Sequence, residues 1–175
     1  SGITVIELAG IGPGPMGGMM LADMGADVIV VERTDGKADA TTDFGSTDIL
    51  KRGKRSIAVD LKSEAGRELV LKLIESANGL IEGMRPGVME RLGLGPEVCL
   101  QRNPELVYGR VTGWGQDGPM ALRAAHDINY IALSGALWYS GRPGEPPFAP
   151  PTLIGDVGGG ALHLFMMMGE LHSEI

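Results

Sequence analysis

The first 32 residues carry the pattern that most constrains the fold. Residues 3–8 are a short β-branched run, residues 9–15 are rich in glycine and proline, and residues 16–24 are small residues and methionines typical of a short helix. Residues 26–32 are almost continuously apolar, which is the pattern of a strand buried on both faces of a sheet. This order predicts two parallel strands joined by a right-handed helical crossover.

The same alternation of strand and helix continues along the chain. Ser63 stands where it would cap one of the helices. Later in the chain, a helix is expected at 127–137, and the glycines at 158–160 are expected to open a last helix. The remaining strands are expected at 55–60, 79–82 and 106–112, and the remaining helices at 64–76, 88–92 and 97–102. We therefore predict an α/β fold, a Rossmann-like parallel sheet with flanking helices, over one domain of residues 1–175.

Charge and composition exclude several classes of protein. Fifteen basic against 22 acidic residues leave a net charge of −7, whereas a general nucleic-acid binder normally carries a basic excess. The chain has one cysteine, so it forms no internal disulfide, and a reducing compartment, the cytoplasm, is expected. No run approaches 18 apolar residues, so no membrane association is expected. Histidine spacing does not fit a zinc site, and no metal is expected.

The glycine-rich loop resembles a dinucleotide-binding fingerprint. Residues 12–17 (GPGPMG) match the G-x-G-x-x-G pattern, and Glu32 stands where the acidic ribose ligand is expected. However, that loop binds pyrophosphate through backbone N–H groups, and Pro13 and Pro15 have none. The pattern therefore favours a tight turn in the sheet over a dinucleotide site.

Two side chains are candidates for acid–base chemistry. His126 follows a Gly/Pro-rich loop at an expected helix start, and Asp156 stands among glycines that allow other atoms to approach closely. Each also has a structural alternative, because residues at a helix start serve as caps or pack against the first turn. The residues alone leave both readings open.

Nine stretches, in continuous order over the whole chain, resemble the family III CoA-transferase group. Residues 126–130 (HDINY) are the most discriminating, because they match the 2-methylacyl-CoA racemases, whereas the CoA transferases differ there and rely on one Asp nucleophile. The stretches are 7–15, 23–28, 60–62, 82–87, 90–95, 112–116, 118–119, 126–130 and 155–160.

The resemblance implies interconversion of (R)- and (S)-2-methylacyl-CoA thioesters through an enolate. His126 would serve one face of the α-carbon and Asp156 the other, each as base in one direction and acid in the reverse. The backbone N–H near Asp127 would stabilise the enolate oxygen. CoA would be part of the substrate, and no tightly bound cofactor is implied.

The resemblance also implies residues that bind the CoA portion. Its phosphates would lie near Arg33, Lys62, Arg85 and Arg91, and its pantetheine and thioester near Ala58, Gly83, Met84 and Tyr130. The basic cluster at residues 51–55 (KRGKR) is expected either to meet the CoA phosphates or to be a solvated loop. The methionines of the last helix have two readings as well, an acyl-chain surface or ordinary core packing.

The sequence departs from the family pattern in composition and in length. Met84 replaces a usual aromatic residue, and Thr152 replaces a usual Asn near the catalytic Asp. Family members are about twice as long, form interlocked homodimers, and place a Glu partner of the catalytic His in the absent half. Two alternatives therefore stay open: a family III CoA transferase acting through an acyl-Asp intermediate, and a catalytically incomplete CoA-binding fragment, the N-terminal part of a longer chain.

Overall fold

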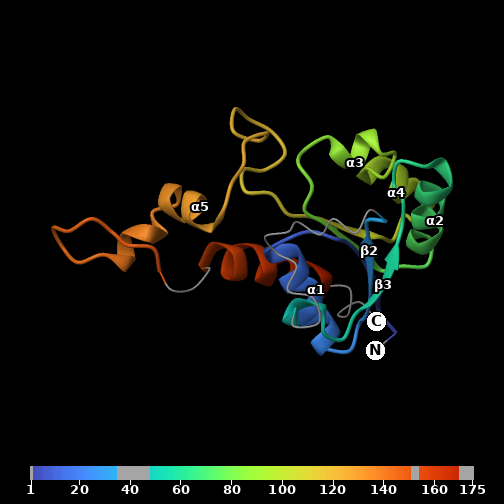
Figure 1. Cartoon of the computed structure of the whole chain (residues 1–175), viewed down its shortest axis with the longest axis horizontal. Coiled ribbons are helices and arrows are strands. Elements are labelled where there is room, and N and C mark those ends of the chain that lie inside the picture. Colours follow the sequence, from blue (N-terminus) through green and yellow to red (C-terminus); the bar gives the residue numbers. More distant parts are fainter. Residues whose placement is uncertain (1, 35–47, 151–153, 170–175) are drawn as a thin grey trace.

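The computed structural model describes residues 2–34, 48–150 and 154–169 and contains one five-stranded parallel sheet (Figure 1). The strand order is β3-β2-β1-β4-β5. The chain places β2 and β3 on one side of β1 and then crosses to the other side, where it adds β4 and β5, with all strands parallel. The strands are β1 (Thr4–Leu8), β2 (Asp27–Glu32), β3 (Arg55–Ala58), β4 (Gly79–Glu82) and β5 (Val107–Arg110). The predicted parallel α/β sheet is confirmed.

Helices cover both faces of this sheet (Figure 1). On one face, α1 (Pro13–Asp23) and α6 (Leu162–Gly169) form a core with Val5 and Ile81. On the other, α2 (Glu64–Ile74), α3 (Val88–Arg91) and α4 (Pro96–Arg102) enclose a core with Ile6 and Leu80. Neighbouring residues of one strand thus enter opposite cores, because successive side chains point to opposite faces. This requirement explains the continuous apolar runs in the sequence.

Helix starts follow the capping residues. Ser63 caps α2, and its hydroxyl accepts the backbone N–H of Gly66 at 3.0 Å, as predicted. The first helix starts at Pro13 and not at residue 16, because proline is well suited to a first helical turn whose N–H groups have no partner within the helix. The glycine-rich loop is therefore shorter than the sequence suggested.

An arm leaves the sheet after β5 and carries α5 (Asp127–Leu133) and the 3₁₀ helix η3 (Ala136–Ser140) (Figure 1). The predicted helix at 127–137 is too long, because Gly135 adopts a left-handed φ of 83° and ends it. The last helical segment begins earlier than predicted, with the π-helix η4 (Ile154–Ala161) running directly into α6. Asp156 consequently lies inside this first helical segment and not before it.

Within the described part of the chain, every helix is too short or too polar to cross a membrane.

Candidate active site

The residues proposed to bind CoA gather at the carboxyl edge of the sheet. Because all strands run parallel, their carboxyl ends meet at one edge, where ligands bind in open α/β sheets. Arg33 follows β2, Ala58 ends β3, and Lys62 lies between β3 and α2. Residues 83–85 follow β4, and Arg91 ends α3. Tyr130 differs, because it lies on α5 in the arm.

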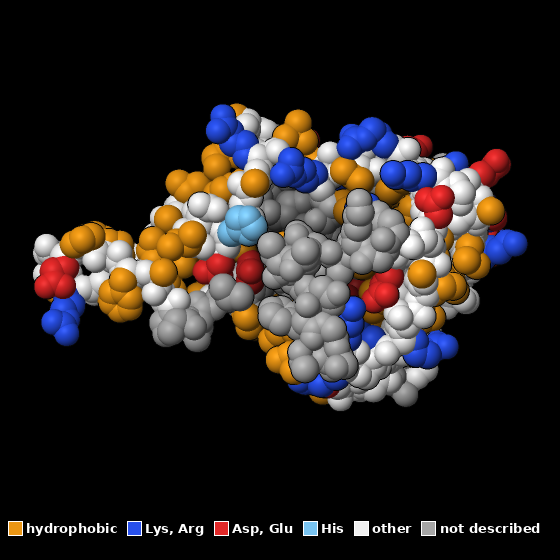
Figure 2. All heavy atoms as spheres, viewed as in Figure 1, with side chains coloured by type: hydrophobic (Ala, Val, Ile, Leu, Met, Phe, Trp, Pro, Cys, Tyr) orange, Lys and Arg blue, Asp and Glu red, His pale blue; other side chains and the backbone are white. Residues whose placement is uncertain are grey.

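Most of these residues are exposed. Arg33, Ala58, Lys62, Arg85 and Arg91 all reach the surface, as does Gly83. Figure 2 shows Lys and Arg side chains along the upper edge of the molecule, over α3 and over the segment between β5 and α5. Positive charge is thus present on the edge where the resemblance places the CoA phosphates.

Met84 is half-buried and packs against the core beneath α2 and α4. Its backbone N–H donates to Glu82 Oε2 at 2.7 Å, so the loop after β4 is tied to the strand itself. The other departure from the family pattern, Thr152, lies outside the described residues.

A buried carboxylate that the sequence analysis did not single out organises this loop. Glu82 is 1% exposed, and its Oε1 accepts the Arg110 Nε–H at 2.8 Å. Arg110 also donates to Glu90 of α3 at 2.7 Å, so it joins β4, β5 and α3. Burial raises the pKa of Glu82, while the hydrogen bonds from Arg110 and Met84 oppose that rise. The sequence did carry a signal for this ion pair, because Glu82 ends β4 and Arg110 ends β5, and both strands are otherwise largely apolar.

Asp127 joins the arm to the segment that carries Asp156. Its side chain is buried, and Oδ2 accepts the backbone N–H groups of Gly155 at 2.6 Å and Asp156 at 2.9 Å. Asp127 is the first residue of α5 and directly follows His126, which is exposed. The backbone N–H of His126 donates to Asn129 Oδ1 at 3.0 Å, which holds this helix start. The structure therefore holds the backbone of Asp156 against Asp127, the residue that directly follows His126.

Asp156 faces the start of α1. A Cβ atom at Gly12 would lie only 3.2 Å from Asp156 Oδ2, and one at Gly160 would lie 2.5 Å from Pro13 Cβ. The glycine-rich loop is thus occupied by the segment carrying Asp156, which favours the tight-turn reading of residues 12–17. Burial raises the pKa of Asp156, Asp127 raises it further, and His126 lowers it.

Tyr130 supports this arrangement by packing. Its ring meets Trp114 edge-on, with ring centroids 6.3 Å apart. A Cβ atom at residue 155 would lie 2.3 Å from Tyr130 Cε2, so Gly155 is required for the ring to fit. The tyrosine therefore holds α5 against η4, while its proposed contact with the thioester stays a prediction.

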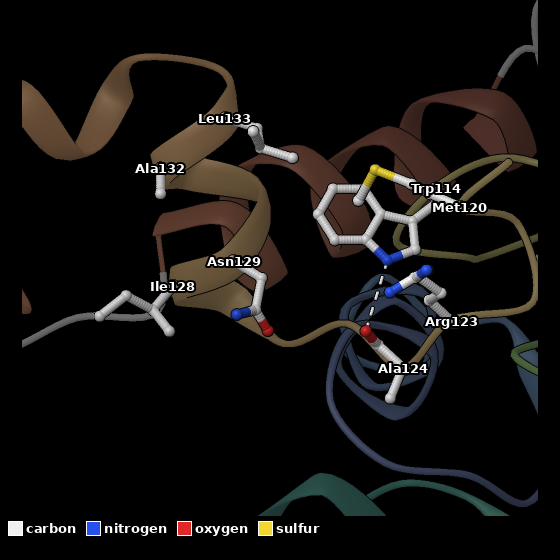
Figure 3. Close-up of a pocket in the computed structure, with 8 residues that line it drawn as sticks. All are labelled: Trp114, Met120, Arg123, Ala124, Ile128, Asn129, Ala132 and Leu133. Atoms are coloured by element: carbon white, nitrogen blue, oxygen red, sulfur yellow. Dashed lines mark hydrogen bonds between the residues drawn. The ribbon is translucent and has the colours of Figure 1, made fainter.

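A pocket of about 440 Å³ opens beside α5 (Figure 3). Trp114 forms one wall, and its indole N–H donates to the carbonyl oxygen of Ala124 at 3.4 Å. Arg123 is the charged residue of an otherwise largely apolar lining. The other lining residues are Met120, Ala124, Ile128, Asn129, Ala132 and Leu133. The pocket is lined by the first turn of α5, which directly follows His126.

Each cation of the basic cluster at residues 51–55 is paired with a carboxylate. The pairs are Lys51–Glu32, Arg52–Asp23, Lys54–Glu7 and Arg55–Asp27. Three of these pairs are at the surface, but the Lys54 and Glu7 side chains are each 2% exposed. The pairing favours the surface-loop reading for Lys51, Arg52 and Arg55, and neither reading anticipated a buried Lys54.

The last helix uses its methionines in different ways. Met168 is 1% exposed and packs with Leu164 in the core under α1, whereas Met166 is 55% exposed. Core packing therefore accounts for Met168. Among the described residues, no group of three or more His, Cys, Asp or Glu side chains is placed to hold a metal ion.

Comparison with known proteins agrees with this architecture. The chain is 49% identical over 163 residues to the alpha-methylacyl-CoA racemase of Mus musculus, covering 92% of this chain and 40% of that protein. It is 37% identical to the acetyl-CoA:oxalate CoA-transferase of Acetobacter aceti, covering 96% of this chain and 44% of that one. A crystal structure of a CAIB/BAIF family protein from Brucella suis superposes with a TM-score of 0.87 at 34% identity, covering 99% of this chain and 49% of its own.

The present chain thus spans about two fifths to one half of the length of these relatives. Residues 1–174 match the sequence pattern of the family described as CoA-transferase family III. The match spans nearly the whole chain, and the fold is shared with the CAIB/BAIF family protein. The chain therefore belongs to CoA-transferase family III.

Proposed function

We propose that this chain carries the proton-transfer site of a racemase that interconverts (R)- and (S)-2-methylacyl-CoA thioesters. The observation that supports it best is that the backbone N–H groups of Gly155 and Asp156 both donate to Asp127 Oδ2. These bonds hold the backbone of Asp156 against the residue that directly follows His126. This supports the proposal, because the reaction needs one acid–base group on each face of a carbon.

The two groups suit this chemistry. Histidine is the side chain that most often serves in general acid–base catalysis, so His126 is suited to transfer a proton in this reaction. The raised pKa of Asp156 makes its carboxylate a stronger base than an exposed aspartate and makes its acid form more accessible. The backbone N–H at the start of α5 is proposed to stabilise the enolate oxygen, since helix N-termini favour negative charge.

The CoA portion of the substrate is proposed to bind along the carboxyl edge of the sheet. Arg33, Lys62, Arg85 and Arg91 would meet its phosphates, because guanidinium and ammonium groups pair well with phosphate. Ala58, residues 83–84 and Tyr130 would lie along the pantetheine and thioester.

CoA transfer through an acyl-Asp intermediate is the competing reaction, since relatives of both kinds are similar to this chain. The position of His126 favours the racemase, because a transferase acting through one carboxylate has no need of an imidazole beside it. A homodimer, a cytoplasmic location and a site completed by residues beyond this chain are further parts of the proposal.

Proton exchange tests the reaction directly. Each epimer of a 2-methylacyl-CoA is incubated in deuterated water with the 175-residue chain and with the longest natural form of the protein. Mass spectrometry after chiral separation then measures α-deuterium in the isomerised and unisomerised thioester. We expect the longest form to exchange both epimers, and exchange by neither form would overturn the proposed reaction.

His126→Ala identifies the two faces. We expect this variant to abolish deuterium incorporation into one unisomerised epimer far more than into the other, and Asp156→Asn to show the opposite selectivity. Equal loss from both epimers in both variants would contradict separate acid–base groups. Exchange by the longest form alone would support the reading of this chain as a catalytically incomplete CoA-binding part.

A further inference from the structure

A buried ion pair lies under α1, away from the groups assigned to acid–base chemistry. The Lys54 ammonium donates to Glu7 Oε2 at 2.6 Å and to the carbonyl oxygen of Pro15 at 2.8 Å. Both side chains are 2% exposed. Burying two charges costs several kcal/mol per ion before their attraction is counted, so a pair of this kind is weak as a source of stability.

The pair connects the central strand of the sheet to the first turn of α1. Glu7 lies on β1, the central strand, where it is opposite Val30 of β2 and Ile81 of β4. Pro15 lies in the first turn of α1. Lys54 therefore fixes the distance between β1 and the start of α1, because its ammonium group is hydrogen-bonded to both.

The helix is shaped to admit this pair. A Cβ atom at Gly18 of α1 would lie 1.9 Å from Glu7 Oε2 and 3.0 Å from Lys54 Nζ, so any larger side chain would displace the pair or the helix. The chain just before Lys54 lies against the far end of α1, where a Cβ atom at Gly53 would meet Ala22. Arg52 is bonded to Asp23 at the far end of α1.

The same helix start receives Asp156. Gly12 is the cap of α1 and lies against the Asp156 carboxylate, and Pro13 lies against Gly160 of the same π-helical segment. A displacement of the first turn of α1 would therefore be passed to Asp156 by direct contact. His126 is one step further from α1, because it belongs to α5 and is connected to the Asp156 segment only through Asp127.

We propose that Lys54 is a positioning residue for Asp156, acting through Glu7 and the first turn of α1. This inference rests on the proposed racemase function. It predicts a larger effect on one face of the substrate, because the contacts from Lys54 reach Asp156 first and reach His126 only through Asp127. A misplacement of about 1 Å is enough to cost about a hundredfold in rate.

The test uses the longest natural form of the protein and the double variant Glu7→Met/Lys54→Met. Replacing both charges by apolar side chains of similar length leaves no buried unpaired charge, so the fold is expected to persist. The bond to the Pro15 carbonyl is lost. We expect deuterium incorporation at the Asp156 face to fall about tenfold, while incorporation at the His126 face changes less than about twofold. The Asp156 face is the one that Asp156→Asn abolishes.

Asp23→Asn is the matched control, because it breaks the exposed pair with Arg52 at the opposite end of the same helix. It should leave both faces unchanged, since exposed pairs contribute little. Gly18→Ala is the second variant, and it should reproduce the selective loss by displacing the pair or the helix. The ratio of the two rates does not depend on the fraction of folded protein, so a partly unfolded variant still decides the question.

An unchanged ratio in the double variant and in Gly18→Ala overturns the inference, as does an equal loss at both faces. If the unsubstituted protein exchanges neither epimer, the proposed function itself fails and this inference fails with it. Selective loss at the His126 face also contradicts it, because the contacts would then act on the wrong group.

Discussion

The sheet and the arm differ in how completely their apolar side chains are buried. In the sheet, side chains such as Ile6 and Leu80 are fully buried between helices on both faces. In the arm, Trp138 is 67% exposed, Tyr139 is 90% exposed and Phe148 is 61% exposed. The candidate site draws on both regions, because His126 belongs to the arm while Asp156 rests on α1 of the sheet. A closely packed region thus supports one group, and a sparsely packed segment carries the other.

Truncation of a core side chain should show the largest contrast between the two regions. We expect Leu80→Ala to lower the free energy of unfolding by about 3 kcal/mol, because it leaves a cavity in a closed core. Tyr139→Ala in the arm should change it by less than about 0.5 kcal/mol. Urea unfolding followed by circular dichroism measures both, and similar losses would show that the arm is as tightly packed as the sheet.

The link between the regions should show the next largest effect. Asp127→Ala removes the acceptor for the N–H groups of Gly155 and Asp156, so Asp156 is no longer held against the start of α5. We expect α-proton exchange to fall about a hundredfold. Asp127→Asn keeps an acceptor oxygen and should retain more activity. Equal activity of Asp127→Ala and the unsubstituted protein would show that the two regions are aligned by other contacts.

Loss of a helix cap in the sheet region should have a moderate effect. Ser63→Ala leaves the Gly66 N–H without its acceptor and should destabilise the protein by about 1 kcal/mol. Ser134→Ala is the comparison in the arm, where the hydroxyl donates to the carbonyl of Ile131 within the same helix. A larger loss for Ser134→Ala in thermal unfolding would reverse the proposed ranking of the two regions.

The smallest effect is expected from the pH dependence of Asp156. The pKa of Asp156 is raised in the folded state, so the folded protein binds this proton more tightly than the unfolded chain does. The resulting stabilisation is fully present at low pH and is lost as the pH rises through the folded-state pKa. Asp156→Asn should therefore be more stable than the unsubstituted protein at neutral pH. The difference should disappear below the ordinary aspartate value of 3.8. Unfolding curves from pH 3 to pH 7 measure it, and a difference that grows toward low pH would contradict this sign.

Patterns within one element were predictable from the sequence. The apolar run at 26–32 indicated a doubly covered strand, and Ser63 indicated a helix start, because both depend on neighbours along the chain. Pro13 and Pro15 indicated a loop with few N–H donors for a pyrophosphate, and the structure occupies that loop with the Asp156 segment. The end of α5 was less predictable, because a glycine can lie within a helix or end it, and only the structure shows that Gly135 adopts the left-handed conformation that ends it.

The sequence by itself determined the parallel sheet, its covered faces and the two candidate acid–base residues, because periodicity and motif are properties of neighbouring positions. Only the tertiary structure decided that Glu7 is bonded to Lys54, 47 positions away, and that Asp127 is bonded to Asp156. Such contacts depend on which elements become neighbours and on how closely glycines let them approach. A charge such as Lys54, which reads as part of a solvated cluster, is buried because Gly18 leaves room for it under α1.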